Sequence, residues 1–333
     1  MFTGLDDIDW KSLRHAHGTA EDVPTWMRGL IDPDPAVRED SLDALYDAAH
    51  HQGDIYDSTV AAVPYLVETL AVPGLPGRGR IAELLTSIAA ISERPDETEP
   101  DEDDQHAEDL VEMRRQAVRA HALVVDAAPS LVCLANDLDP AMRAAAPKLL
   151  LAAAVPDLAG LLLGVLETER EPGVRRSLLD VLGCLQLGDA AIGRLLGLNR
   201  STPASSTLAA LIAVARTDPY RVPLNDVPDL IDRAYAEEGP ATEPADLRSG
   251  TVIRSPPEGR RAPHCTRLLE SLTDPLGPRV AERTAIVTPL LSSPHDDLAG
   301  DALFAVYNLI GEWRGDYGEA VTRIAGLLDR SQQ

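Results

Sequence analysis

The chain has 333 residues and a formal net charge of −24, because 54 acidic residues outnumber 30 basic ones. A surface this acidic is repelled by phosphate backbones and anionic membrane faces, which argues against a general nucleic-acid binder and favours a basic or metal-carrying partner. The same charge also serves solubility, and charge alone does not separate the two roles.

The composition favours an all-α protein. Hydrophobic residues make up 44% of the sequence, but aromatic residues only 4%. The core must therefore consist mainly of Leu, Ala, Val and Ile, and short aliphatic side chains suit close packing of helix on helix. Stretches of alternating β-branched residues are nearly absent.

Three features favour the cytoplasm. The cysteines at positions 133, 184 and 265 show neither zinc-site spacing nor a disulfide framework, which fits a reducing compartment. The first residues lack the basic start and apolar core of a signal peptide. The apolar stretch 149–166 is interrupted by Pro156 and Asp157, which predicts a turn between two core helices rather than a membrane span.

Hydrophobic spacing and capping residues predict a series of helices, which make about eight helical hairpins in one α-α superhelix over residues 1–333. In chain order they are expected at 21–31, 35–50, 57–71, 78–91, 107–125, 128–136, 140–154, 157–168, 172–186, 188–198, 204–216, 226–237, 263–273, 278–291, 296–313 and 316–330. Phe2 and Trp10 are expected to anchor the N-terminal end, and Trp313 and Tyr317 the other end, because terminal units must cover an open core face.

Three of these helices begin with the same turn, in which an acidic residue, Pro, any residue, Val or Met, and Arg follow one another. The turns run from Asp34 to Arg38, from Asp139 to Arg143 and from Glu171 to Arg175. A second acidic residue precedes each turn by two positions, and a leucine follows each arginine by seven. The arginines lie 105 and 32 residues apart, about three units and one unit of a mid-thirties repeat.

The turn has a direct physical explanation. Its acidic residue is an N-cap, which accepts hydrogen bonds from free backbone N–H groups. Proline occupies the first helical position, where its missing N–H costs nothing. The arginine is placed to pair with an acidic turn residue of its own or a neighbouring repeat. We expect a structural ladder of such pairs that fixes the angle between hairpins; direct contact of these arginines with a partner stays open.

The acidic-Pro-x-Val-Arg turn followed by an apolar helix resembles the HEAT-repeat family of the PBS-lyase type. The stretches 21–53 and 59–66 are similar to uncharacterised actinobacterial HEAT-repeat proteins. The resemblance covers roughly residues 20–190; beyond it, Asp274-Pro275 and the segment 293–297 keep the turn without the arginine spacing. It implies a superhelical binding scaffold and no particular ligand, because such repeats serve many unrelated partners.

Two inserted loops interrupt the helices. Residues 93–109 contain ten acidic residues and one arginine, which predicts a mobile loop that attracts a basic partner or a cation, or is merely solvated. Residues 239–263 contain five prolines and a group of basic residues, which suits either contact with a partner or a tolerated insertion. The basic residues of this insertion are Arg248, Arg254, Arg260 and Arg261.

The densest group of reactive side chains surrounds the end of the second helix, and consists of Tyr46, His50, His51, Asp54, Tyr56 and Asp57. A histidine beside an aspartate can orient a general base or bind a metal ion, as the pair Asp47 and His51 illustrates. The spacing matches no metal motif, so structural capping, partner contact, and metal or catalytic chemistry all stay open. We assign no catalytic residue, metal or cofactor.

Other reactive positions give weaker signals. His15 and His17 lie in an N-terminal segment without a clear pattern, and His264-Cys265 begins a predicted helix without a resolving cysteine nearby. The glycine-rich stretch 74–80 contains Pro76, directly follows Pro73 and comes after no strand, so we interpret it as a connector rather than a phosphate loop.

These patterns predict a cytosolic scaffold that binds a protein partner on a concave face lined by the second helix of each hairpin. One alternative is an acidic immunity or inhibitor protein that neutralises a basic toxin or nuclease. Another is an enzyme or binder for a small molecule enclosed by the solenoid, using the cluster from Tyr46 to Asp57. A nucleic-acid enzyme of the HEAT-like glycosylase type is disfavoured, because it needs a basic groove.

Overall fold

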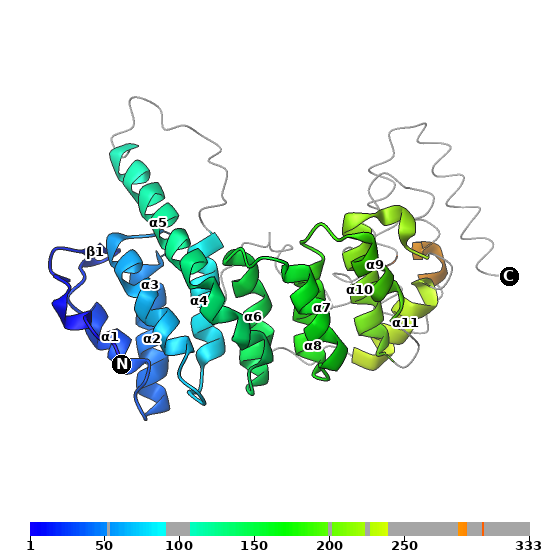
Figure 1. The fold of residues 1–333 in the computed structure, drawn as a ribbon, viewed down its shortest axis with the longest axis horizontal. Helices are drawn as coiled ribbons and strands as arrows, with labels where there is room; N and C mark the ends of the chain where they lie inside the picture. The colour runs from blue at the N-terminus through cyan, green and yellow to red at the C-terminus, as the bar shows by residue number, and fades with distance from the viewer. Residues whose placement is uncertain are drawn as a thin grey trace. The chain divides into compact units, whose positions relative to one another are not determined.

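The computed structural model describes residues 1–51, 54–90, 107–198, 202–223, 227–238, 286–291 and 302 (Figure 1). The chain divides into two compact units, Met1–Val181 and Leu182–Gln333, which are described separately below. Within the described ranges, helices dominate and the strands are the two-residue pair β1 (Arg14–His15) and β2 (Gly18–Thr19). The prediction of an all-α protein is therefore confirmed.

The first unit contains a series of helices. They are α1 (Val23–Gly29), α2 (Pro35–Ala49), α3 (Asp57–Leu70), α4 (Arg78–Ala90), α5 (Ala107–Leu131), α6 (Pro140–Ala152), α7 (Leu158–Thr168) and α8 (Pro172–Leu182), which ends at the boundary. Short 3₁₀ helices lie at Leu5–Asp7 and Val132–Asn136.

One expected boundary is wrong. The sequence predicts separate helices at 107–125 and 128–136, whereas α5 continues to Leu131 before the chain tightens into the 3₁₀ helix. The buried residues Ala117, Ala120, Val124 and Ala128 are spaced by three or four positions and carry one apolar stripe through the supposed break. Pro129 lies inside the helix and deprives it of one backbone N–H donor, but the helix continues past it to Leu131.

The middle helices of the first unit, α3 to α6, pack against both adjacent and next-but-one helices. α3 packs on α5 and α4 packs on α6, while α3 with α4, α4 with α5, and α5 with α6 form the contacts between successive helices. The side chains between them are aliphatic, as the composition predicts; Leu45, Leu66, Leu85 and Met142 are at most 1% exposed. α4 and α6 therefore lie side by side, as the ribbon shows (Figure 1).

The N-terminal segment covers one end of this unit. Phe2, Leu5 and Trp10 are buried, the Phe2 backbone N–H donates to Glu68 Oε1 at 2.9 Å, and the Trp10 indole N–H donates to the Leu5 carbonyl oxygen at 2.8 Å. Phe2 also meets the ring of Tyr65 edge to face. These contacts are the ones expected of an N-terminal cap.

One segment among the described residues, Val111–Asn136, is long and apolar enough to cross a membrane by length and composition. It comprises most of α5 and the following 3₁₀ helix, and α5 contacts α3, α4 and α6. Its buried residues lie on one stripe, the pattern of a core helix in a helical stack. The apolar stretch 149–166 forms parts of two shorter helices, α6 and α7, with Asp157 in the left-handed region at φ 48° between them.

In the second unit, α10 (Ala204–Thr217) packs against α9 (Asp189–Leu196) and α11 (Val227–Glu238). Almost the whole of α10 is buried, which its Ala- and Leu-rich sequence explains. The carboxylate of Glu237 accepts the backbone N–H groups of Ala204 and Ser205 and so joins α11 to the start of α10. A short 3₁₀ helix, Pro219–Arg221, ends the turn after α10.

Several predictions lie outside the described residues. They are the insertion 239–263 with Arg248, Arg254, Arg260 and Arg261, the residues His264, Cys265, Trp313 and Tyr317, and most of the acidic loop 93–109. The last three residues of that loop belong to α5. The expectation of one continuous array over the whole chain stays a prediction.

Candidate functional site

The three acidic-Pro turns make the same hydrogen bonds at equivalent positions. In each, the leading acidic side chain accepts the N–H two residues later: Asp32 from Asp34, Asp137 from Asp139, and Glu169 from Glu171, at 2.8, 2.9 and 2.8 Å. The arginine of each turn donates to the carbonyl oxygen six residues earlier: Arg38 to Asp32, Arg143 to Asp137, and Arg175 to Glu169, at 2.6, 2.9 and 3.1 Å. The repeated sequence therefore builds a repeated structure.

The N-cap role of the acidic residues is visible in two of the turns. Asp34 Oδ1 accepts the Ala36 N–H at 2.9 Å, and Asp139 Oδ1 accepts the Ala141 N–H at 3.0 Å. Each cap satisfies a backbone donor that has no partner within its helix. Two kinds of bond thus stabilise the turn: the N-cap side chain accepts a backbone N–H of the helix, and the arginine side chain donates to a carbonyl oxygen of the preceding loop.

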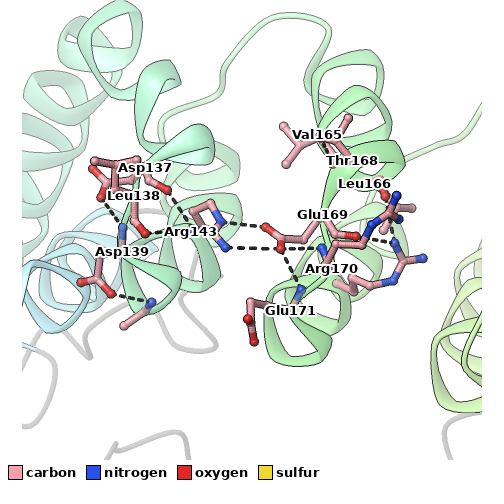
Figure 2. Close-up of polar contacts among 12 residues, drawn as sticks. Asp137, Leu138, Asp139, Arg143, Val165, Leu166, Thr168, Glu169, Arg170 and Glu171 are labelled. Atoms are coloured by element: carbon pink, nitrogen blue, oxygen red, sulfur yellow. Dashed lines mark hydrogen bonds and ion pairs between the residues drawn. The ribbon is translucent and has the colours of Figure 1, made fainter.

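Arg143 joins two turns, as Figure 2 shows. Its Nε and Nη2 donate to the carboxylate of Glu169, at 2.7 and 3.3 Å. The Glu169 side chain is only 5% exposed, so the pair is screened little by solvent. The hydrogen bonds from Arg143 and from the backbone N–H groups of Glu171 and Arg170 outweigh burial and lower the pKa of Glu169 to about 2. This carboxylate fixes α6 to the turn that begins α8.

A second buried pair joins α4 to the turn before α6. Arg78 donates to Asp137 at 2.7 Å and also to the carbonyl oxygens of Leu70 and Leu75, and its side chain is 5% exposed. Burial raises the pKa of Asp137, but the Asp139 N–H and the Arg78 guanidinium outweigh it and hold the pKa below its usual value. Sequence reasoning missed Arg78, because the stretch 74–80 lacks the acidic-Pro signature of the other turns.

The Tyr46–Asp57 cluster does not converge on one point. Tyr46 and His50 face α4: the Tyr46 hydroxyl donates to the Arg80 carbonyl oxygen at 3.5 Å, and His50 Nε2 lies 2.6 Å from Ser87 Oγ. Burial, reinforced by the charge of Glu83, raises the pKa of Tyr46. These two side chains join α2 to α4.

The other members of the cluster have separate neighbours. Tyr56 donates its hydroxyl to Asp54 at 3.5 Å, and burial together with this carboxylate raises the pKa of Tyr56. Asp57 Oδ1 accepts the backbone N–H of Arg14 at 2.7 Å, and His51 Nδ1 lies 3.1 Å from the Asp47 carbonyl oxygen. The contacts of the cluster therefore go to several different neighbours.

The N-terminal hairpin adds a histidine that the cluster predicted from sequence did not include. The Ala16 N–H donates to the Ala48 carbonyl oxygen at 3.1 Å, which fixes the hairpin to the end of α2. His17 Nε2 then lies 2.9 Å from Asp47 Oδ2, and the rings of His17 and His51 lie 5.5 Å apart. His17 and Asp47 are 30 residues apart in sequence, and no local sequence pattern predicts that their side chains lie close together.

Comparison with known proteins does not show which family this chain belongs to. No family model matches the chain, and no curated protein matches it in sequence. Among solved structures, the crystal structure of an engineered protein is 16% identical, covering 92% of this chain and 82% of its own, with a TM-score of 0.29. That similarity is too low to carry an argument. The class that the structure itself defines is an all-α protein with a recurring capped turn and a short N-terminal hairpin.

Proposed function

We propose that the chain is a HEAT-type α-solenoid that acts as a cytosolic scaffold and binds a protein partner. The observation that carries the proposal is the recurrence of one bonding pattern at three turns, together with two buried pairs: Arg78–Asp137 joins α4 to the turn before α6, and Arg143–Glu169 joins α6 to the turn before α8. Repeated units of this kind bury their apolar faces by stacking and present an extended surface to macromolecules.

In this proposal the second helix of each hairpin, namely α3, α5 and α7, lines the concave binding face. α5 exposes two apolar side chains on that layer, Val111 at 50% and Val118 at 56%. They lie seven residues apart, two helical turns, and therefore on one side of the helix. Single exposed valines are common, but two in line on the proposed face are its best contact points.

The charge of −24 supports a basic partner, because complementary charge steers association and raises its rate. An acidic immunity or inhibitor protein that neutralises a basic toxin or nuclease is the specific form that this charge favours. A small-molecule enzyme receives less support, because the contacts of the Tyr46–Asp57 cluster go to several different neighbours.

The test is affinity capture from the cytosol of the source cell at low and high salt, followed by mass spectrometry. We expect a basic protein in a stoichiometric amount, with an association rate that falls as salt screens the charges. Two variants locate the face. The double substitution Val111→Asp and Val118→Asp is expected to abolish capture, since it places charge within an apolar contact.

The matched control is Val37→Asp, which changes a valine that is 39% exposed on α2, in the other layer. This variant is expected to capture the partner as the wild type does. The proposal is wrong if no stoichiometric protein is retained, or if the double variant and Val37→Asp retain it equally. Association that is insensitive to salt removes the support for a basic partner.

A further inference from the structure

Three side chains with metal-binding atoms meet at the C-terminal end of α2. His17 Nε2 lies 2.9 Å from Asp47 Oδ2, and His51 Nδ1 lies 3.5 Å from Asp47 Oδ1. One ligand atom from each of the three residues lies within 4.8 Å of the other two. The group combines two imidazoles with one carboxylate, the mixed nitrogen and oxygen set that zinc and its neighbours in the first transition row bind.

The surrounding structure holds this group in place. The Ala16–Ala48 backbone bond and the bond from the Arg14 N–H to Asp57 fix the hairpin to the ends of α2 and α3. The His17 N–H donates to Nδ1 of His15 at 3.0 Å, and the buried His15 is bonded through Nε2 to Asp22. His15 therefore holds the backbone of His17 in place, and the His17 side chain lies against the end of α2.

Asp47 lies in the last turn of α2, and His51 follows the C-cap residue of that helix, His50. The two side chains are four residues apart in sequence and lie close together, with His51 Nδ1 3.5 Å from Asp47 Oδ1. All three side chains remain open to solvent, with exposed fractions of 51% for His17, 66% for Asp47 and 36% for His51. An ion therefore has a direct entry path, and exposed side chains can rotate to close around it.

We propose that His17, Asp47 and His51 form a binding site for a divalent transition-metal ion of the zinc class. Zinc bonds of 2.0–2.1 Å in a tetrahedral site place ligand atoms about 3.3 Å apart, close to the two separations observed here. Three protein ligands leave a fourth position for water. The ion would cross-link the N-terminal hairpin to α2, and this inference is independent of the proposed protein-binding function.

The test titrates Zn²⁺ into the untagged, chelator-treated chain by isothermal calorimetry at neutral pH, in the presence of excess Mg²⁺. Magnesium saturates sites made of carboxylates alone, whereas the imidazoles favour zinc. We expect one saturable site per chain. Co²⁺ is the second probe, because its visible absorption spectrum reports its coordination geometry.

Three variants remove one ligand each: His17→Ala, Asp47→Asn and His51→Ala. Each is expected to weaken Zn²⁺ binding roughly tenfold or more, since even the loss of an outer hydrogen bond to a ligand costs that much. Asp40→Asn is the matched control; it makes the same charge change as Asp47→Asn at an exposed position of the same helix. It is expected to bind like the wild type. Circular dichroism verifies that every variant is folded.

Thermal unfolding gives an independent readout, because a ligand that binds only the folded chain raises its melting temperature. Zn²⁺ is expected to raise Tm for the wild type and Asp40→Asn but not for His17→Ala. The inference is overturned if the wild type shows no saturable zinc binding, or if folded His17→Ala binds with unchanged affinity. Equal weakening by Asp40→Asn also overturns it, since binding would then reflect general negative charge.

Discussion

Arg143 of α6 holds the carboxylate of Glu169 with two N–H donors, and the same carboxylate accepts the backbone N–H groups of Arg170 and Glu171. One side chain thus closes the turn before α8 and binds that turn to α6 (Figure 2). Ser177 of α8 adds a hydrogen bond to the Ala144 carbonyl oxygen at 2.6 Å. The strength of this junction can be measured directly.

Glu169→Gln is expected to lower the free energy of unfolding by about 3 kcal/mol, because it leaves the guanidinium of Arg143 without its buried counter-ion. Urea unfolding of wild type and variant measures the difference. Glu39→Gln is the control: Glu39 forms an exposed pair with Arg80 at 3.5 Å, and its loss is expected to change stability by less than about 1 kcal/mol. Equal losses in the two variants would contradict a special role for Glu169.

The same carboxylate predicts a pH dependence. The pKa of Glu169 is about 2 in the folded chain, compared with 4.5 for an ordinary glutamate, so its ionised form stabilises the folded state above 4.5. This contribution, about 3 kcal/mol in full, is lost as the pH falls from 4.5 towards 2. The stability difference between wild type and Glu169→Gln should therefore shrink over that range. A difference that stays constant in acid would show that the carboxylate is not the stabilising group.

Arg78→Ala is expected to destabilise the chain by about 3 kcal/mol, because it leaves Asp137 without its buried partner and frees two carbonyl oxygens. Arg80→Ala, two residues later, removes an arginine that is 47% exposed and pairs with Glu39 and Asp43. It should cost less than about 1 kcal/mol. Chemical denaturation of the two variants compares buried and exposed arginines in one helix; the reverse order of stabilities would refute the assignment.

Gly29→Ala is expected to cost about 1–3 kcal/mol, because a Cβ at Gly29 would lie 1.9 Å from Ser41 Oγ and 2.9 Å from Ser41 Cβ, across the contact between α1 and α2. Gly164→Ala in α7 meets nothing within 4 Å and should instead stabilise the chain by up to about 1 kcal/mol, the gain in helix propensity. Melting temperatures of both variants test the opposite signs. A stabilised Gly29→Ala would mean that α1 shifts freely on α2.

The helices could be predicted because their signals are local. An acidic N-cap followed by Pro marks the starts of α2 and α6, and both helices begin at the expected residue, Pro35 and Pro140. The end of α5 was misplaced, because the sequence predicts a break between 125 and 128 and only the packing of the apolar stripe shows that the helix continues. The two-residue strands of the hairpin are too short to show alternation.

The candidate sites depend on contacts that sequence spacing does not encode. Asp47 and His51 are recognisable as a pair four residues apart in sequence, but His17 reaches them only because the hairpin is bonded to Ala48. Arg78 likewise meets Asp137 across 59 residues. The sequence shows an arginine within a glycine-rich connector, but it does not show that this arginine is buried, because burial is a property of the folded chain.

The hydrogen bond from the Phe2 N–H to Glu68 spans 66 residues, which is the widest separation among the side-chain bonds described above. Both residues precede α4, so this bond needs nothing that follows α4 in the chain, and the entropy cost of closing a loop grows only slowly with its length. The N-terminal helices can therefore acquire their bonds while the ribosome is still adding the later ones. A nascent chain arrested after α4 should already resist proteolysis over the segment that Phe2 and Glu68 enclose.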